Sequence, residues 1–446
     1  MNVVGIISEL NPFHNGHSYI IKQAKELTDA SYVVLVMSGN YVQRGEPAFL
    51  EKDFRVKAAL KSGADMVIEL PIPFATSSAE YFSSAGVALL RQLGCITHLA
   101  FGSENGSIQD LRKACSLLTL EERPSFQAVL KDSLSKGMVY AKAREEALYH
   151  VYQEEYGKTS KEQSVIWTKE TIHDLLSKPN NALGLSYMQA LQKQKSLITP
   201  VTIKRIGNAY EDTGLSNTGF SSASGIRAQA SNGKLEATLS SIPESCREEF
   251  SQLIKENYDM GADEFTLPLL TKLLESGKEA LLSYQDVTDS LADKLLKKRF
   301  EAQSFTELAM SCKSKDITYA HIMRALLHVT LGITKEECAS RIDKGYSNYA
   351  SILGYKSTAS ELFKQFKAHA SIPTLVRISD AEKHLDEASL AYFKKDLQRD
   401  ALYQVLLQRK IGLSDTRSTL WTYESPSAKA KLPVSFHPYK RQVICI

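Results

Sequence analysis

The 446-residue sequence lacks the marks of a secreted, zinc-binding or membrane-spanning chain. Its six cysteines are scattered without CxxC or Cys/His zinc spacing, so we expect free thiols and no metal ligands among them. No stretch approaches the roughly 20 apolar residues of a membrane span. The N-terminus has no basic segment followed by a long apolar run, as a secretory signal would have. We therefore expect a soluble, cytoplasmic protein with no membrane partner.

Charge and composition are not extreme either. Hydrophobic residues make up 43% of the chain and charged residues 24%, which is ordinary for a globular protein. The net charge of +3 permits a nucleic-acid partner without requiring one. The length suggests two or three domains, and no internal repeat or low-complexity tract is visible. The function must therefore be sought in local motifs.

The first part of the chain alternates between short apolar runs and helical patterns. The expected strands are 3–7, 31–40, 66–71, 97–104 and 199–207, and the expected helices between them include 50–65, 77–94 and 180–192. Nearly continuous apolar strands that alternate with helices predict an α/β fold with a parallel sheet covered on both faces.

Beyond about residue 232 the strand signals fade and helical patterns take over. The expected helices are 250–257, 267–274, 291–308, 318–331, 359–370 and 387–408. We therefore predict a catalytic domain over 1–232, with a helical insertion at about 107–178, and a mostly α-helical domain over 233–446.

The segment GIISELNPFHNGH, residues 5–17, joins the first expected strand to a helix. A helix N-terminus carries unpaired N–H groups and partial positive charge, and it therefore binds anions. Pro12 sets the turn, and Gly16 lets a ligand approach the backbone. His14 and His17 add imidazole donors aimed at charge that develops in a transition state. This pattern indicates a phosphate site without a Walker-A or GxGxxG motif; the alternative is two surface histidines that cap a helix.

The HNGH sequence resembles the HxGH signature of the nucleotidyltransferase superfamily, which is related to class I aminoacyl-tRNA synthetases. The resemblance implies that His14 and His17 contact the phosphates of ATP while the α-phosphate is attacked. It also implies a later Ser/Thr-rich helix start with Ile-Arg, and SSASGIR, residues 221–227, fits. Arg227 would clamp phosphate there, whereas the alternative is a plain helix cap.

Further segments resemble one family in particular. The blocks VMSGNYVQRGEPA, GADMVIELP, SSAEYFSSAGVALL, FGSE, PNNALGLSYMQAL and IKRIG resemble those of the bacterial tRNA(Met) cytidine acetate ligases. With the opening motif they cover most of residues 1–230, while ITYAHIMRALLHVTLGI and YASILGYK resemble the family's helical region more loosely. The resemblance implies a Rossmann-like nucleotidyltransferase domain followed by helices that contribute to tRNA binding.

The family is understood to acetylate N4 of the wobble cytidine, C34, in elongator tRNA(Met). Acetate and ATP would give acetyl-adenylate and pyrophosphate, and acetyl transfer to the cytidine would then release AMP. The resemblance thus implies ATP with Mg²⁺ as its companion, and tRNA and acetate as partners, with no protein partner evident. Two alternatives stay open: a small-molecule adenylyltransferase, and a non-catalytic RNA-binding protein with a vestigial nucleotide site.

The resemblance assigns the catalytic role to His14, His17 and Arg227 and an ATP-binding role to a larger set. That set comprises Ile7, Ser8, Glu9, Leu10, Asn11, Pro12, Phe13, Asn15, Gly16, Tyr19, Ile20, Gly102, Asn180, Asn181, Arg205, Ile206 and Ser222. The alternatives here are a turn glycine at 102, helix caps at 180 and 181, and a surface salt bridge at 205.

Two further groups are candidates for substrate contacts. Gln43 and Arg44 follow the second expected strand, and a carboxylate such as acetate favours an arginine partner; the alternative is an ordered connecting loop. A basic run on expected helices could follow RNA phosphates, or be a solvated face. Its members are Lys297, Lys298, Arg299 and Arg324, with Lys313 and Lys315 nearby.

Overall fold

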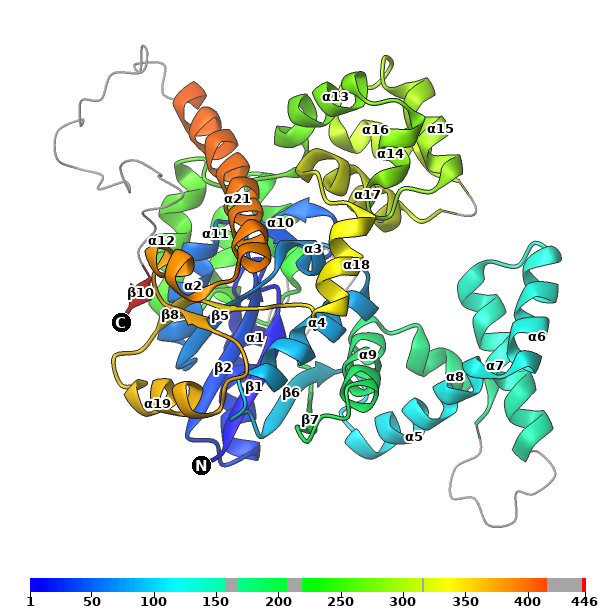
Figure 1. Ribbon diagram of the computed structural model, residues 1–446, viewed down its shortest axis with the longest axis horizontal. Helices are drawn as coiled ribbons and strands as arrows, with labels where there is room; N and C mark the ends of the chain where they lie inside the picture. Colours follow the sequence, from blue (N-terminus) through cyan, green and yellow to red (C-terminus); the bar gives the residue numbers. More distant parts are fainter. Residues whose placement is uncertain (157–166, 207–218, 315–316, 415–442) are drawn as a thin grey trace.

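The computed structural model of the chain describes residues 1–156, 167–206, 219–314, 317–414 and 443–446 (Figure 1). At its centre is an eight-stranded sheet with the order β10-β8-β5-β2-β1-β6-β7, in which β9 also pairs with β8. The strands are β1 (Val3–Ser8), β2 (Tyr32–Ser38), β5 (Met66–Leu70), β6 (His98–Ser103), β7 (Thr199–Lys204), β8 (Ala350–Tyr355), β9 (Thr374–Leu375) and β10 (Ile444–Cys445), with β3 (Tyr41–Val42) and β4 (Glu46–Pro47) in a separate hairpin. Strands β5, β2, β1, β6 and β7 pair in parallel. The predicted α/β class and its five parallel strands are confirmed.

Alternate residues of the central strands face opposite sides of the sheet. Val4 and Ile6 of β1 belong to one buried cluster, while Val3 and Ile7 belong to another. The first side is covered by α1 (Asn15–Leu27) and α2 (Lys52–Lys61), and the second by α4 (Ala79–Gln92) and α9 (Pro179–Lys193). The central strands β1 and β2 are almost entirely apolar because both of their faces are buried, whereas the edge strand β7 is mostly half-buried or exposed.

The region beyond residue 232 is mostly helical, as predicted, but it also contributes three short strands that the sequence analysis did not predict. β8 runs antiparallel to β5 and β10 lies beside β8, so the second half of the chain extends the sheet. The sequence signal was weak because β8, with the sequence ASILGY, has only two large apolar residues in succession, Ile352 and Leu353, followed by a glycine. A side chain at Gly354 would collide with Val56 of α2. The division at 232/233 stays a prediction, although the sheet itself crosses it.

The single helix expected over 291–308 was wrong. Two helices occupy this stretch, α15 (Asp289–Lys298) and α16 (Phe305–Cys312). The Ser304 hydroxyl accepts a hydrogen bond from the backbone N–H of Glu307 at 3.2 Å, and thereby starts α16. A Ser-x-x-Glu sequence is a helix start signal, and here it overrides the continuous helical pattern.

The other helices expected in the second half are present. They are α12 (Glu244–Lys255), α13 (Thr266–Glu275), α17 (Tyr319–Leu331), α19 (Ser360–His369) and α21 (Glu387–Ser414). The expected insertion holds α5 (Ile108–Leu118), α6 (Pro124–Ser135), α7 (Tyr140–Tyr156) and α8 (Lys169–Leu176), which extend away from the sheet at the right of Figure 1. The remaining helices are α3 (Ile72–Ala75), α10 (Ala223–Ser231), α11 (Leu235–Thr238), α14 (Lys278–Ser283), α18 (Lys335–Asp343) and α20 (Ala381–His384). No helix in the described ranges has the length and apolar character needed to cross a membrane.

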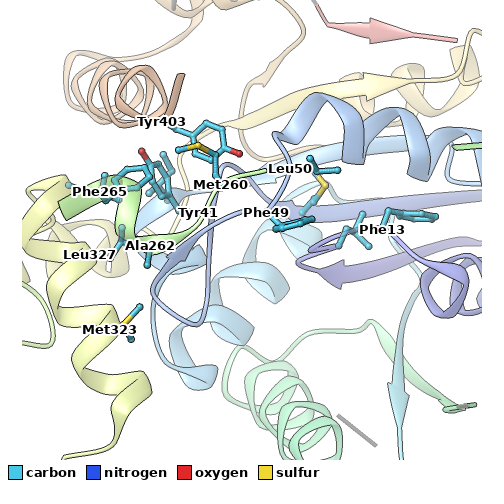
Figure 2. Packing of buried hydrophobic residues seen from close by; sticks show 14 of the residues in the cluster. Phe13, Tyr41, Phe49, Leu50, Met260, Ala262, Phe265, Met323, Leu327 and Tyr403 are labelled. Carbon is cyan, nitrogen blue, oxygen red and sulfur yellow. The ribbon is translucent and has the colours of Figure 1, made fainter. Parts of the chain in front are cut away.

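Residues from the second half of the chain pack against the β3–β4 hairpin. Tyr41 is buried between Phe265 and Tyr403, with ring centroids 5.8 and 6.1 Å away (Figure 2). The Tyr41 hydroxyl donates a hydrogen bond to the carbonyl of Arg399 at 2.7 Å. The hairpin is therefore anchored by side chains more than 200 residues away in the sequence.

A glycine lets the tip of the same hairpin approach α17 closely. Gly45 has a φ of +77°. A side chain there would collide with the backbone of Met323 and Arg324. The hairpin thus lies directly against α17, and the residues beside Gly45 are held in place.

Candidate active site

The chain leaves β1 through a tight turn that leads to the start of α1. Leu10 has a φ of +53°, and the Asn11–Pro12 peptide bond is cis. The buried Asn11 side chain accepts a hydrogen bond from the backbone N–H of Phe49 at 2.7 Å. Leu10 and Phe13 are buried in the core. The turn is therefore fixed by apolar packing and by the loop that follows β2.

Arg55 of α2 holds the carboxyl ends of β1 and β2 together. Its side chain is fully buried and donates to the carbonyls of Glu9 at 2.8 Å and Ser38 at 2.9 Å, and also to that of Gly39. Burial lowers the pKa of Arg55 to about 10, so the guanidinium stays charged at neutral pH. A buried cation that binds carbonyl oxygens fixes the backbone at the point where both strands end.

His14 and His17 use the same ring nitrogen to accept backbone hydrogen bonds. Nδ1 of His14 accepts from the N–H of Gly16 at 3.0 Å, which caps α1. Nδ1 of His17 accepts from the N–H of His14 at 3.3 Å, and the two ring centroids are 3.8 Å apart. An accepting Nδ1 carries no proton, so the proton of each neutral ring is on Nε2. Each ring therefore has one donor available to a ligand.

Both histidines are neutral at physiological pH. Burial, followed by the charges of Arg205 and Arg227, lowers the pKa of His14 from 6.5 to about 3. Burial, with His14 and Arg205 beside it, lowers the pKa of His17 well below 6.5. The site thus combines neutral hydrogen-bond donors with arginine charges, an arrangement suited to a polyanion.

The second motif begins α10 on the other side of the same turn. Ser222 caps this helix, because its hydroxyl accepts from the N–H of Gly225 at 3.0 Å. Arg227 lies one turn later and donates to the carbonyl of Asn11 at 2.6 Å. The helix cap is present, and Ser222 and Arg227 also line the cleft described next, so their role in ligand binding stays a prediction.

The residues predicted from the sequence converge on one cleft at the carboxyl end of β1. Those that line it are Ile7, Ser8, Glu9, Leu10, Asn11, His14, His17, Ile20, Gln43, Arg44, Gly102, Asn180, Arg205, Ser222 and Arg227. A smaller adjoining pocket adds Gly16, Tyr19 and Ile206. Ligands of parallel α/β sheets bind in such crevices at the strand ends.

Four residues predicted to bind ATP, namely Pro12, Phe13, Asn15 and Asn181, line neither the cleft nor the adjoining pocket. Pro12 and Phe13 are buried. Asn15 donates to the carbonyls of Gly219 and Ser240, each at 2.9 Å. The buried Asn181 accepts from the backbone N–H groups of residues 104 and 105. These side chains connect segments of the backbone, so the structure gives them a supporting position.

Gly102 and Arg205 shape the side of the cleft next to β6 and β7. A side chain at Gly102 would begin 3.0 Å from Ile20 and 3.2 Å from Arg205, so glycine keeps this side open. Arg205 donates to the Asn180 side chain at 3.3 Å, and Asn180 in turn donates to Glu104 at 2.6 Å. This chain of contacts orients the arginine towards the cleft. The last residue of the expected fifth strand, Gly207, lies outside the described residues.

The β3–β4 hairpin contributes Gln43 and Arg44 to the opposite side. The backbone N–H of Gln43 donates to the Glu9 carboxylate at 2.5 Å. Within the described ranges, the Gln43 side-chain nitrogen is buried and has no hydrogen-bond partner. A buried donor without an acceptor costs about 1–3 kcal/mol, which a ligand oxygen would recover. Glu46 on the same hairpin does not line the cleft.

The sequence analysis missed the apolar wall of the cleft. It is made of Ile6, Ile21, Leu35, Phe82, Phe101, Leu183 and Tyr187, with Ala223 and Ser224 at the start of α10. One signal was available on α9, where Asn180, Leu183 and Tyr187 share a face through their i, i+3 and i+7 spacing. The other wall residues come from several elements, and only the fold brings them together.

The basic residues of the second half differ in their exposure and in their contacts. Lys297 is exposed, and Lys298 donates to the carbonyl of Ser311. Arg299 is half-buried and donates to two carbonyls of the preceding helical segment at 2.8 and 3.1 Å. Arg324 pairs with Asp286 at 3.0 Å, with 16% of its side chain exposed. Lys315 lies outside the described residues.

Comparison with known proteins relates the whole chain to enzymes of one kind. The HIGH Nucleotidyl Transferase family matches residues 1–417. The tRNA(Met) cytidine acetate ligase of Halothermothrix orenii is 33% identical over 407 residues, which cover 90% of this chain and 93% of that protein.

Solved structures similar to this chain include two of one protein, Thermotoga maritima TmcAL. The apo form I crystal structure of Thermotoga maritima TmcAL superposes with a TM-score of 0.83 and 29% identity, over 92% of this chain and 96% of that chain. The structure of the same protein bound with alpha-thio ATP superposes with a TM-score of 0.80 and 29% identity, over 91% and 95% of the two chains.

Proposed function

The chain belongs to the HIGH nucleotidyl transferase family and, within it, to the tRNA(Met) cytidine acetate ligases, and on this premise we propose that it acetylates the wobble cytidine of elongator tRNA(Met). Acetate and ATP form acetyl-adenylate and pyrophosphate in the first step. The acetyl group then passes to N4 of C34, and AMP is released. The observation that supports this most strongly is the convergence of two neutral histidines and three arginines on one cleft at the end of β1.

The first step needs charge stabilisation and alignment rather than a protein nucleophile. The Nε2–H groups of His14 and His17 donate to the phosphates of ATP as negative charge develops on them. Arg227 binds phosphate from the start of α10. Neutral imidazoles suit this role because they donate hydrogen bonds at fixed positions and need no protonation during the reaction.

The two sides of the cleft bind different parts of the substrates. Gly102, Asn180 and Arg205 form the side that accepts the adenosine of ATP. Gln43 and Arg44 form the side that accepts the acetate carboxylate, since the buried Gln43 amide lacks an acceptor among the described residues. In this arrangement the carboxylate binds on the hairpin side of the cleft, next to the phosphates that the histidines and Arg227 bind.

Mg²⁺ enters this account only as the companion of ATP. Across the described residues, no group of three or more His, Cys, Asp or Glu side chains is arranged to hold a metal ion. Mg²⁺ in nucleotide sites is bound largely by phosphate oxygens and water, with few protein ligands. When bound with ATP it supplies neutralisation of phosphate charge, and none of the steps above is assigned to it.

The helices beyond residue 232 are the part that we assign to holding the RNA. Lys297 and Lys298 could contact backbone phosphates there, while an unstacked base of the anticodon loop would reach the cleft. A substrate of this kind places the enzyme in the cytoplasm.

Nucleoside mass spectrometry tests the proposal. The protein is incubated with elongator tRNA(Met), ATP and isotope-labelled acetate, and the digested tRNA is searched for labelled N4-acetylcytidine. The matched controls omit acetate, or use a transcript with uridine at position 34. Label at position 34, together with AMP release that requires both acetate and tRNA, is the expected result.

Absence of the labelled nucleoside, with protein that is folded and binds ATP, would contradict the proposal. Transfer of the adenylyl group to a small molecule would then support the adenylyltransferase alternative. A His14→Ala variant that still binds tRNA but no longer modifies it would exclude the alternative of a non-catalytic RNA-binding protein.

A further inference from the structure

Acetyl transfer to an amine requires a group that takes up a proton. N4 of cytidine carries two protons, and it must lose one when it becomes an amide nitrogen. A side chain positioned to accept that proton accelerates such a step by roughly 10²–10⁴-fold. This inference rests on the proposed function and concerns its second step.

The histidines and the tyrosine of the cleft are poorly suited to accept the proton. His14 and His17 carry their proton on Nε2 and use Nδ1 for backbone hydrogen bonds. Tyr187 donates its hydroxyl to the carbonyl of Ile7 at 3.3 Å, and burial raises its pKa. Of the described residues that line the cleft, Glu9 is the one that carries a carboxylate.

Glu9 is held firmly in the position between β1 and the hairpin. The buried Arg55 binds its carbonyl at 2.8 Å, which fixes the backbone. One carboxylate oxygen, Oε1, accepts the backbone N–H of Gln43 at 2.5 Å. The residue that follows, Leu10, has a φ of +53° and is buried, so the turn directs the chain sharply away from Glu9. The carboxylate is thus placed beside the pair that we assign to acetate.

We propose that the Glu9 carboxylate accepts the N4 proton of cytidine during acetyl transfer. The N4 lone pair attacks the carbonyl carbon of acetyl-adenylate, and a C–N bond forms. The bond from that carbon to the bridging oxygen breaks, and AMP leaves with its electron pair. The N4 proton passes to Glu9, which later returns it to solvent. No oxidant, reductant or further reactant is needed.

Charged residues around Glu9 come from three elements, and some raise its pKa while others lower it. Burial raises its pKa, and Glu46 of the hairpin adds to this effect. Arg227 of α10 and Arg44 of the hairpin lower the pKa and favour the ionised form, while the Gln43 hydrogen bond acts in the same direction. Arg55 of α2 faces the backbone of Glu9. Burial makes the carboxylate a stronger base, and the arginines favour its ionised state.

A Glu9→Gln variant separates the two steps of the reaction. It keeps an oxygen for the Gln43 N–H but cannot take up a proton at neutral pH. Acetate-dependent exchange of labelled pyrophosphate into ATP reports the first step, and single-turnover transfer from enzyme-bound acetyl-adenylate to tRNA reports the second. Because Glu9 also lines the ATP cleft, exchange can fall as well, and the test is the difference between the two steps: we expect transfer to fall by roughly 100-fold or more and to fall at least about 10-fold further than exchange.

The pH profile gives a readout that a structural role would not move. Wild-type transfer should slow as the pH falls through the pKa of Glu9, because the protonated carboxyl cannot accept a proton. This limb should be absent from Glu9→Gln. Glu46→Gln, which removes a carboxylate from the same hairpin but outside the cleft, is the matched control and should keep both steps. If Glu9→Gln does not fold, Glu9→Asp should fold and retain the pH limb with slower transfer.

Three results would overturn the inference. Transfer at the wild-type rate by Glu9→Gln would exclude a proton acceptor at this position. Equal loss of exchange and transfer would assign Glu9 to ATP or acetate binding. If Glu9→Gln needed more Mg²⁺ than wild type for the exchange reaction, Glu9 would be a metal ligand. Absence of acetate-dependent exchange in the wild-type protein would instead overturn the acetate ligase proposal, and this inference with it.

Discussion

The histidines of the cleft at the end of β1 and the cationic side chains of the helical group α13–α17 bind the backbone in opposite ways. In the cleft, backbone N–H groups bind the rings of His14 and His17 and leave one donor of each ring for a ligand. In the helical group, side chains bind the backbone: Arg299 donates to two carbonyls, and Lys298 donates to the carbonyl of Ser311. In the cleft the backbone positions the two histidine rings, whereas in the helical group cationic side chains hold the backbone together.

The comparison teaches that residue type alone does not identify a binding surface. Arg324 and Arg299 were candidates for RNA contact because of their charge, yet both make internal contacts. Substitutions in the cleft should therefore reduce activity with little loss of stability. Substitutions of these arginines should reduce the free energy of unfolding with little direct effect on ATP binding.

The largest effect is expected from His14→Asn in the cleft. Asparagine keeps an N-cap acceptor for α1 but lacks the Nε2 donor. Removing one donor to developing phosphate charge should lower kcat by roughly 10²–10³-fold. The measurement is AMP formation with acetate and tRNA, with thermal melting in parallel and the exposed His384→Asn as the control.

Melting close to wild type would show that His14→Asn acts on the reaction. An activity close to wild type in this variant would break the comparison, since it would make His14 a helix cap and nothing more.

A second expectation concerns His328, the buried histidine of α17. Both of its nitrogens have partners, Thr76 at 3.1 Å and the carbonyl of Gln285 at 3.2 Å. Burial lowers the pKa of His328 from 6.5 to about 4. The unfolded chain therefore binds a proton that the folded one does not, so stability falls as the pH drops below 6.5. The loss attributable to His328 between pH 7 and pH 5 should be about 2 kcal/mol.

Urea unfolding of wild type and His328→Gln at both pH values checks this expectation. The variant should be less stable at pH 7, but it should lose about 2 kcal/mol less than wild type on acidification. An identical pH dependence of the two proteins would show that His328 is not held neutral by the fold.

A third expectation concerns Arg299 of the helical group, which we expect to contribute to stability and not to ATP binding. Arg299→Ala removes hydrogen bonds to the carbonyls of Leu273 and Ser276, and should lower the free energy of unfolding by about 1–2 kcal/mol. The KM for ATP in acetate-dependent pyrophosphate exchange should not change. A wild-type melting temperature in Arg299→Ala combined with lost tRNA affinity would show that this arginine contacts RNA after all.

The smallest effect is expected from the neighbouring Lys297→Ala. This lysine is exposed, so its removal should change stability by less than about 0.5 kcal/mol. If it contacts a phosphate, tRNA affinity should fall a few-fold and the slope of log K against log salt should decrease by about one. Filter binding across a salt series measures both. An unchanged slope would place the RNA surface elsewhere.

The sequence predicted the parallel sheet and much of the cleft because both depend on local signals. A strand, a turn and a helix start are encoded within residues 5–17, and the motif at 221–227 has the same local character. Parallel strands end on the same edge, so the segments that follow them meet there. The family resemblance assigned His14, Arg205 and Arg227 to one site, and all three line the cleft at this edge.

The rest depends on contacts between distant parts of the chain. β8 lies beside β5 through pairing that no local pattern indicates, and its Gly354 is explained by Val56. The wall residues Phe82 and Leu183 come from different helices. Tyr41 fixes the hairpin through partners in the second half. Such features could not be read from composition or periodicity.

The most direct test of the central claim follows the oxygen atoms of acetate. In the proposed reaction an acetate oxygen attacks the α-phosphate and remains on it when the acetyl group leaves. With acetate labelled with oxygen-18 at both oxygens, the AMP released during tRNA acetylation should contain one labelled oxygen. Unlabelled AMP accompanied by acetylated tRNA would show that acetate is activated by another route, and would contradict the role assigned to this cleft.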